Sequence, residues 1–412
     1  MRKTLLSCPS VIVLGCLAAC GGTGSDRPWL SEVETVTAPA GPGSRYPHLA
    51  GGGDVPVVIS WLQPEGGDRH ALQFALWRDD LWSESVTVTS GSGWFVNWAD
   101  FPSVVPIDER TWAAHWLEQR PGNVFAYDVR LAVTRDAGAN WSEPISPHDD
   151  GTPTEHGFVS MLGENGMVQA LWLDGRQTAG APGHQGGHSA AAGAMTLRTT
   201  TIDDHGRRIG PDLELDGRVC DCCQTDVART SEGLIAVFRD RSEGEQRDIA
   251  VVRLVDGKWS APVPLHPDGW RIDACPVNGP AVDARGARVA VAWFTAPDRP
   301  HVRVAFSDDS GKSFSPPVEV ASGDVIGRVD VVMLDDGRAV VSWLRRSGQG
   351  AEIVARPYDP RGAAGSEVVI ASATVQRSSG FPQMLGAGDQ LLFAWTDSSD
   401  PPQLRTARAR LR

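Results

Sequence analysis

Val57-Val58-Ile59-Ser60-Trp61 is the first copy of a short apolar run that closes on an aromatic residue and recurs along the chain. The closing residues follow one another at intervals of 50 to 66 residues. They are Trp61, Trp116, Trp172, Phe238, Trp293, Trp343 and Trp395. A period of this length is typical of a four-stranded β-propeller blade. The sequence therefore predicts an all-β fold with seven four-stranded blades.

A second marker, a serine that opens a predicted outer strand, recurs 22 to 26 residues after the aromatic residue. It occurs at Ser83, Ser142, Ser260, Ser315 and Ser366. After Trp395 there is no such copy, but LSEVETV at 30–36 near the N-terminus closely resembles WSESVTV at 82–88. We predict that this N-terminal strand completes the last blade and closes the ring, which removes an exposed sheet edge.

Two turn sequences, Thr134 to Trp141 and Ser307 to Phe314, follow the pattern S/T-x-D-x-G-x-x-W/F. They resemble the Asp-box, or BNR repeat, of bacterial sialidases. Its structural residues here are Asp136, Gly138, Trp141, Asp309, Gly311 and Phe314. The aspartate accepts backbone N–H bonds, the glycine permits positive φ, and the aromatic ring packs beneath the turn. The resemblance implies a propeller, for which six blades is the alternative because this family is usually six-bladed, and it implies little about activity.

The N-terminal segment has the features of an export signal. Arg2 and Lys3 precede an apolar stretch that is too short to span a membrane. The sequence LAACG at 17–21 resembles a bacterial lipobox, which implies cleavage before Cys20 and a lipid on its sulfur; an ordinary signal peptide is the alternative. We expect a lipoprotein signal peptide at 1–19, lipidated Cys20 with a tether at 20–28, and one propeller domain at 29–412.

This organisation predicts a lipid-anchored protein of the outer membrane that faces the periplasm or the cell surface. The formal net charge of −13 argues against nucleic acid as a partner. The membrane contact would then be the lipid alone, and the expected partner is an anionic small molecule or a glycan, with a protein partner as an alternative.

The unusual residues fall into loops that should share one face of the propeller. Connections between blades and loops between second and third strands open on the face opposite the Asp-boxes. The segments are 218–226, 239–248, 271–280 and the long loop 174–194. They contain CDCCQT at 220–225 and ACPVNGPA at 274–281, and with these motifs the chain resembles a group of exported bacterial proteins described as sialidase-like. The resemblance implies the fold more strongly than a reaction.

Four cysteines of the predicted mature chain, Cys220, Cys222, Cys223 and Cys275, lie in these segments. An even number in an exported protein favours disulfides, including one between Cys275 and the cluster. Cys220 and Cys275 each precede the aromatic residue of their repeat by 18 residues, so we expect them side by side. The alternatives are a copper or zinc site that adds His184, His188 or His156 to the sulfurs, and a free reactive thiol.

Arginine precedes the first strand of five predicted blades. Together with two arginines of the 239–248 loop, these form the predicted ligand-binding set. The set is Arg45, Arg218, Arg239, Arg241, Arg271, Arg328 and Arg377. Guanidinium groups bind carboxylate or phosphate with two parallel hydrogen bonds. The alternative is that each arginine pairs with a neighbouring acid and ties blades together.

The residues that a sialidase requires are incomplete in this chain. Such an enzyme uses three arginines, a tyrosine paired with a glutamate, and an acid/base aspartate. Tyr127 and Tyr358 fall in predicted third strands, and Tyr46 falls in the wrong blade for the nucleophile. Asp221, Asp240 and Glu243 remain as acid/base candidates for another hydrolase.

The leading hypothesis is recognition of an anionic ligand, a glycan or another cell-envelope component, at the face that carries the cysteines and arginines. A glycan-cleaving hydrolase of sialidase-like type is the second hypothesis. A metal-binding or scaffold protein of the cell envelope is the third. The sequence alone leaves open whether the protein is an enzyme.

Overall fold

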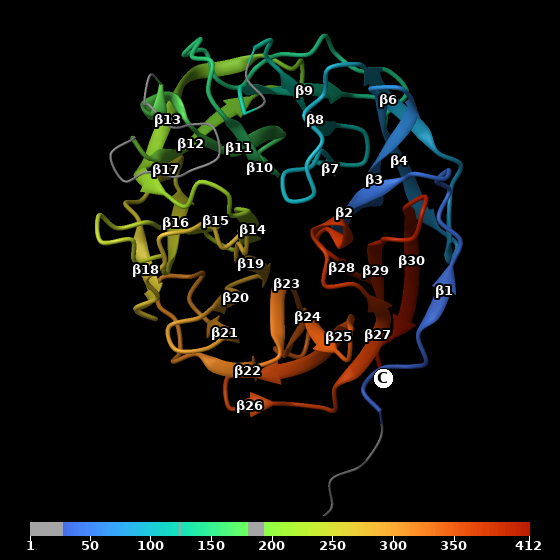
Figure 1. Ribbon diagram of the computed structural model, residues 1–412, viewed down its shortest axis with the longest axis vertical. Coiled ribbons are helices and arrows are strands. Elements are labelled where there is room, and N and C mark those ends of the chain that lie inside the picture. The colour runs from blue at the N-terminus through green and yellow to red at the C-terminus, as the bar shows by residue number, and fades with distance from the viewer. Residues whose placement is uncertain (1–27, 123–124, 180–192) are drawn as a thin grey trace, which may run out of the picture.

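The computed structural model describes residues 28–122, 125–179 and 193–412, and its strands form seven antiparallel sheets arranged around a common centre (Figure 1). The chain is a seven-bladed β-propeller, so the predicted fold class and blade number are confirmed and the six-bladed alternative is wrong. The predicted signal peptide, Cys20, His184 and His188 lie outside the described residues. None of the described helices is long and apolar enough to cross a membrane.

The first three blades occupy the N-terminal half. Blade 1 contains β2 (Arg45–Gly52), β3 (Val55–Gly66), β4 (Arg69–Arg78), β5 (Leu81–Trp82) and β6 (Val86–Gly91). Blade 2 contains β7 (Ser103–Pro106), β8 (Trp112–Gln119) and β9 (Tyr127–Thr134). Blade 3 contains β10 (His156–Glu164), β11 (Met167–Asp174), η1 (Arg176–Thr178), β12 (Met195–Ile202) and β13 (Arg208–Val219).

The remaining blades repeat the same order. Blade 4 contains β14 (Asp226–Thr230), β15 (Gly233–Arg239), β16 (Ile249–Val255), β17 (Lys258–Trp259) and β18 (Val263–His266). Blade 5 contains β19 (Ala281–Arg285), β20 (Arg288–Thr295), β21 (His301–Ser307) and β22 (Val318–Ser322). Blade 6 contains β23 (Val325–Met333), β24 (Ala339–Ser347), β25 (Gly350–Asp359), β26 (Gly362–Ala363) and β27 (Val368–Ala373). Blade 7 contains η2 (Arg377–Ser379), β28 (Gln383–Ala387), β29 (Gln390–Asp397), β30 (Gln403–Arg410) and β1 (Glu34–Val36).

The repeated aromatic residues lie on the second strand of each blade and are buried. Trp61, Trp172 and Trp293 are fully enclosed between neighbouring sheets. Replacing one of these rings with alanine would leave a cavity, so we expect the free energy of unfolding to fall by about 3–5 kcal/mol. This regular burial explains why the aromatic period reports the blade number.

The repeated serine attaches the outer strand to the third strand. In blade 1 the Ser83 amide donates to the Leu76 carbonyl at 2.8 Å, and the Leu76 amide donates to the Ser83 hydroxyl at 3.0 Å. The same pair of bonds recurs at Ser142, Ser260 and Ser315. Ser366 differs, because Pro357 of its third strand has no N–H to donate and its carbonyl accepts from Ala364 instead.

Ser31 makes this pair of bonds with Arg410, at 2.8 Å in both directions. Beyond it β1 pairs with β30, so the first described strand is the outer strand of the last blade. The predicted closure of the ring is confirmed.

The two turns of Asp-box sequence have matching hydrogen bonds. Asp136 accepts from the Thr134 hydroxyl at 2.7 Å and the Asn140 amide at 2.8 Å. Asp309 accepts from the Ser307 hydroxyl at 2.7 Å and the Ser313 amide at 3.0 Å. Hydrogen bonds from Asn140 lower the pKa of Asp136 to about 2. Both turns follow a third strand, so they lie on one face of the ring.

Deleting residues 30–37 should open the propeller, because β30 would lose its outer partner and the apolar surface under Leu30 would be exposed. We expect the Tm to fall by more than about 10 °C, or the protein to aggregate. The measurement is a thermal melt by circular dichroism, with deletion of residues 21–27 as the control that leaves the Tm unchanged. A 30–37 deletion that melts like the parent would contradict the closure.

Candidate functional site

The connection between blades 1 and 2 crosses the centre of the ring on the face opposite the Asp-box turns. We call residues 95–102 the crossing segment. At its start the Phe95 amide donates to the Leu117 carbonyl near the end of β8, and the chain then runs toward the centre of the ring. It reaches blade 4, where the Gln224 side chain donates to the Ala99 carbonyl at 2.7 Å. In Figure 1 it is the cyan loop beside β7 that extends toward the centre.

Asp100 anchors the crossing segment to blades 2 and 3. Its carboxyl group accepts from the Tyr127 hydroxyl and from the Phe158 amide, both at 2.8 Å. The carboxyl group fits because Gly157 has no side chain; a Cβ there would lie 1.9 Å from an Asp100 oxygen. Burial raises the pKa of Asp100 to about 7. The segment is therefore held by buried polar contacts and not only by apolar packing.

Trp98, in the middle of the crossing segment, is half-buried and contacts two arginines and an aromatic ring. Its ring stacks on Phe381 of the blade 6–7 connection with a centroid distance of 5.7 Å. The guanidinium carbons of Arg328 and Arg377 lie 4.8 and 5.9 Å from the Trp98 ring. Cation–π attraction and stacking hold this group together. We call these four residues, together with Arg45, the mouth cluster; Arg45 is included because it precedes Tyr46, whose ring lies against Gly380, next to Phe381.

Left-handed backbone conformations recur where inner strands begin at this face. Tyr46, Phe158 and Arg328 have φ of 56°, 53° and 52°, and each lies in a register shift between the first and second strands. Such conformations are costly for non-glycine residues and concentrate at functional sites. Tyr46 also lies against Gly380, where a Cβ would come within 3.3 Å of its ring. Strained residues thus surround the mouth cluster.

The mouth cluster carries positive charge without acidic partners. Arg328 is buried and donates to the carbonyls of Gly380 at 2.8 Å and Gln376 at 3.2 Å. Burial, together with the charge of Arg377, lowers the pKa of Arg328 to about 10. In the part of the chain that the structure describes, the Arg45 and Arg377 side chains have no hydrogen bond or ion pair, and the Arg45 Nε is buried. This is the electrostatic environment that an anion would neutralise.

The other predicted arginines divide into exposed and buried groups. Arg271 is exposed and its side chain has no acidic partner among the described residues, whereas Arg218 lies 3.6 Å from Glu245. Arg241 is buried and pairs with Asp221 at 2.9 Å and Glu245 at 2.9 Å. Arg239 is 1% exposed and donates to the carbonyls of Asn278, Arg247 and Phe294. Of the predicted set, Arg239, Arg241 and Arg328 are therefore buried, whereas Arg271 and Arg377 are exposed.

The four cysteines form two disulfides on this face. Cys220 bonds to Cys223, and Cys222 bonds to Cys275, with Cα separations of 5.7 and 6.1 Å. The sequence predicts Cys220 as the neighbour of Cys275. In the structure the Cys220 amide donates to the Arg239 carbonyl, and this bond holds Cys220 against blade 4. Cys222 therefore reaches the next blade. Sulfurs in disulfides are not thiolates, so this state does not provide the predicted copper or zinc ligands.

The three acid/base candidates have different surroundings. Asp221 is buried against Arg241, and Glu243 is exposed in the loop after β15. Asp240 is half-buried, and burial raises its pKa. All three tyrosines are buried; burial raises the pKa of Tyr127 and, for Tyr358, raises it to about 12. A buried phenol that keeps its proton is a poor nucleophile.

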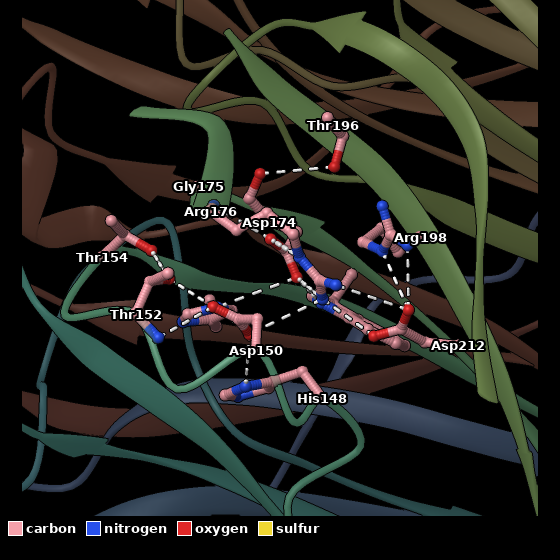
Figure 2. A network of polar contacts seen from close by, with 12 residues as sticks. His148, Asp150, Thr152, Thr154, Asp174, Gly175, Arg176, Thr196, Arg198 and Asp212 are labelled. Atoms are coloured by element: carbon pink, nitrogen blue, oxygen red, sulfur yellow. Dashed lines mark hydrogen bonds and ion pairs between the residues drawn. The ribbon is translucent and has the colours of Figure 1, made fainter. Parts of the chain in front are cut away.

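A polar network joins blades 2 and 3 on the same face (Figure 2). Asp150 contacts His156 Nε2 at 3.0 Å and His148 Nδ1 at 3.4 Å, and Arg176 bonds to Asp174 at 2.7 Å and Asp212 at 2.8 Å. Burial opposes ionisation of Asp150, but the hydrogen bonds from the two histidines hold its pKa well below the usual range.

Asp128, His148 and His156 place ligand atoms within 4.8 Å of one another, which raises the question of a metal site. The two imidazole rings are stacked at 3.8 Å with an interplanar angle of 5°. Imidazole lone pairs lie in the ring plane, so stacked rings aim them parallel and not at one ion. The geometry instead fits a polar tie between two blades.

Three half-buried aspartates join the inner strands of blades 4 to 7. Asp226 accepts from the Val282 amide at 2.7 Å, Asp283 from Met333 at 2.7 Å, and Asp330 from Met384 at 2.6 Å. Each carboxyl group thereby satisfies an N–H on the innermost strand of the following blade, where no further strand is available. Burial raises the pKa of Asp226 to about 7, of Asp283 to about 6 and of Asp330 to about 8.

The residues singled out from the sequence lie on the same face as the mouth cluster, but the sequence reasoning missed Trp98, Asp100 and Phe381. One signal was available: the connection 92–102 contains four aromatic residues, which is unusual for a loop. The shallow surface hollows at 336–338 with 359–361 and at 108–111 lie on the Asp-box face, away from the mouth cluster.

No known protein family profile matches the chain, and no curated protein sequence is similar to it. Among solved structures, the chain is similar to a protein of unknown function from Dyadobacter fermentans, with 14% identity and a TM-score of 0.52 over 94% of this chain and 100% of that one. It is also similar to the sialidase of Trypanosoma rangeli, with 12% identity and a TM-score of 0.46 over 75% and 54%. A puromycin hydrolase matches with 13% identity and a TM-score of 0.49 over 89% and 53%. The similarity concerns the fold alone.

Replacing Asp330 with asparagine should flatten the pH dependence of stability between pH 7 and 9. The raised pKa means that the folded state retains a proton that the unfolded chain has lost, so this stability is complete below about pH 4 and is lost as the pH rises through about 8. Histidines and the other titrating groups are common to both proteins, so the difference between the two pH profiles reports Asp330.

The measurement is the free energy of unfolding in urea at pH 7, 8 and 9. We expect the parent protein to lose about 1 kcal/mol more than the variant between pH 7 and 8, and only a few tenths of a kcal/mol more between pH 8 and 9, where the folded carboxyl group ionises as well. Parallel pH profiles for the two proteins would contradict the raised pKa.

Proposed function

We propose that the protein is an exported lipoprotein that recognises an anionic, carboxylate-bearing ligand at the mouth cluster. The observation that carries the proposal is the positive charge around Trp98. Arg328 and Arg377 approach the same indole ring, Arg45 precedes Tyr46, which lies against Gly380, and no described acid pairs with any of the three. In a chain of net charge −13, such an uncompensated group of guanidinium ions favours an anion.

The chemistry of the cluster favours a ligand that combines a carboxylate with an apolar face. Arg377 is exposed and Arg45 is half-buried, so both can turn a guanidinium edge toward a carboxylate. The half-buried Trp98 ring supplies a flat apolar surface beside them. An acidic sugar has both features, which supports an acidic glycan of the cell envelope as the ligand class.

Recognition accounts for the described residues better than hydrolysis. A glycosidase needs two carboxyl groups, or a tyrosine and an acid, that face each other across the bound sugar. Asp100, in the same segment as Trp98, is buried and bonded to Tyr127 and Phe158. The cluster therefore has groups that bind an anion and lacks an exposed acid/base pair among the described residues.

The proposed location follows from the sequence at 17–21 and is part of the same proposal. A lipid on Cys20 would tether the propeller to the outer membrane through residues 21–28. The motifs at 220–225 and 274–281 support placing the chain with the exported sialidase-like proteins that they resemble.

Replacing Arg377 with alanine should weaken binding of an acidic sugar without unfolding the protein. The probes are glucuronic acid and N-acetylneuraminic acid, with glucose as the neutral comparison, and the measurement is isothermal titration calorimetry. We expect binding of an acid but not of glucose, and a loss of about tenfold or more in the variant because one bidentate contact is removed. The Tm should stay within a few degrees, as for other exposed residues.

Arg361→Ala is the matched control. Arg361 is an exposed arginine on the Asp-box face, and its removal should leave binding unchanged. Equal effects of the two substitutions, or binding of glucose as strong as that of the acids, would overturn the proposal.

A further inference from the structure

The first disulfide closes a Cys-x-x-Cys sequence, Cys220-Asp221-Cys222-Cys223, and the second disulfide begins inside it. The sulfur atoms of Cys220, Cys222 and Cys223 all lie within 4.8 Å of one another. A sulfur of the outer disulfide, Cys222–Cys275, is therefore next to both sulfurs of the inner disulfide, Cys220–Cys223. Thiol–disulfide exchange requires this kind of proximity between an attacking thiolate and a disulfide sulfur.

The two disulfides differ in their exposure to solvent. Cys220 and Cys223 are each 1% exposed, whereas Cys222 and Cys275 are partly exposed. An external thiol can therefore approach the outer disulfide but not the inner one. Any electrons that reach the inner disulfide must pass through the outer one.

The inner disulfide has a positively charged neighbour that favours exchange. The Arg247 guanidinium donates to the Cys220 sulfur at 3.4 Å and is itself buried. A guanidinium ion beside a sulfur stabilises its thiolate form and makes that sulfur the better leaving group. Glu245 holds Arg247 in place with an ion pair of 2.8 Å.

A purely mechanical role explains the outer disulfide but not the inner one. Cys222 and Cys275 are 53 residues apart, so their bond ties blade 4 to the blade 4–5 connection. Cys220 and Cys223 are only three residues apart. A loop so short restrains the unfolded chain much less than the outer bond does.

We propose that the four cysteines form a two-step thiol–disulfide relay that oxidises exported dithiols, independently of ligand binding at the mouth cluster. A substrate thiolate attacks the Cys275 sulfur, the bond to Cys222 breaks, and Cys222 leaves as a thiolate. The second substrate thiol then displaces Cys275. The substrate now carries a disulfide, and its two electrons reside on Cys222 and Cys275.

In the second step the Cys222 thiolate attacks the Cys223 sulfur, and Cys220 leaves as a thiolate beside Arg247. Cys275 then attacks Cys222, which restores the outer disulfide and releases Cys223. The net result is an inner dithiol and an outer disulfide, so the two electrons have moved inward. A more oxidising protein or glutathione disulfide removes them by the reverse sequence.

The test adds one equivalent of reduced dithiothreitol to the folded, fully oxidised protein, followed by acid quenching, alkylation and mass spectrometry of the cysteine peptides. We expect alkylation to appear first at Cys222 and Cys275 and then at Cys220 and Cys223. In the variant Cys222→Ser with Cys275→Ser, the inner pair should be alkylated at least tenfold more slowly. Melting curves of both oxidised proteins verify that each remains folded.

Two outcomes overturn the relay. Alkylation of the parent that stays on Cys222 and Cys275 would mean that the inner disulfide receives no electrons. Equally rapid reduction of the inner pair in the double variant would mean that reduction does not pass through Cys222. In a further comparison Arg247→Met should slow the second step about tenfold, while Arg247→Lys, which retains the charge, should preserve it.

Discussion

The hydrogen bonds between β1 and β30 are the contacts on which the rest of the molecule depends. Without them blade 7 would end in an open edge, and the blades at the two ends of the chain could separate. The Ser31–Arg410 pair reproduces the bonds that attach outer strands in blades 1, 2, 4 and 5, so closure uses the same local chemistry as each repeat. The ring in turn fixes how far apart the inner strands lie.

A closed ring creates a second requirement at its centre, because each innermost strand has an edge with no further strand to pair with. Asp226, Asp283 and Asp330 meet this requirement by accepting an amide of the following blade. Ser60 does the same for Val104 between blades 1 and 2. These side chains link neighbouring sheets around the ring, and desolvation raises the pKa of the three carboxyl groups.

An irregular segment of the chain lies across one face of this ring. The crossing segment is held by Asp100 on one side and by stacking of Trp98 on Phe381 on the other. It brings an aromatic ring from the blade 1–2 connection to arginines from blades 6 and 7. The disulfides reinforce the same face on the side of blades 4 and 5. Anion recognition and thiol exchange would thus occupy neighbouring but separate parts of one face.

The sequence alone determined the fold class, the number of blades and the closing strand. Each blade buries one aromatic residue, and most blades attach their outer strand through one serine, so both residues recur with a period that can be counted. It also assigned the cysteines and arginines to one face, since strand order dictates which loops share a face. Only the tertiary structure decided which of those residues are exposed. Arg239 and Arg377 look alike as letters, but one is enclosed by carbonyls of the next blade and the other is exposed beside Trp98. Such differences arise from contacts between residues that lie dozens to hundreds of positions apart, which no local pattern encodes.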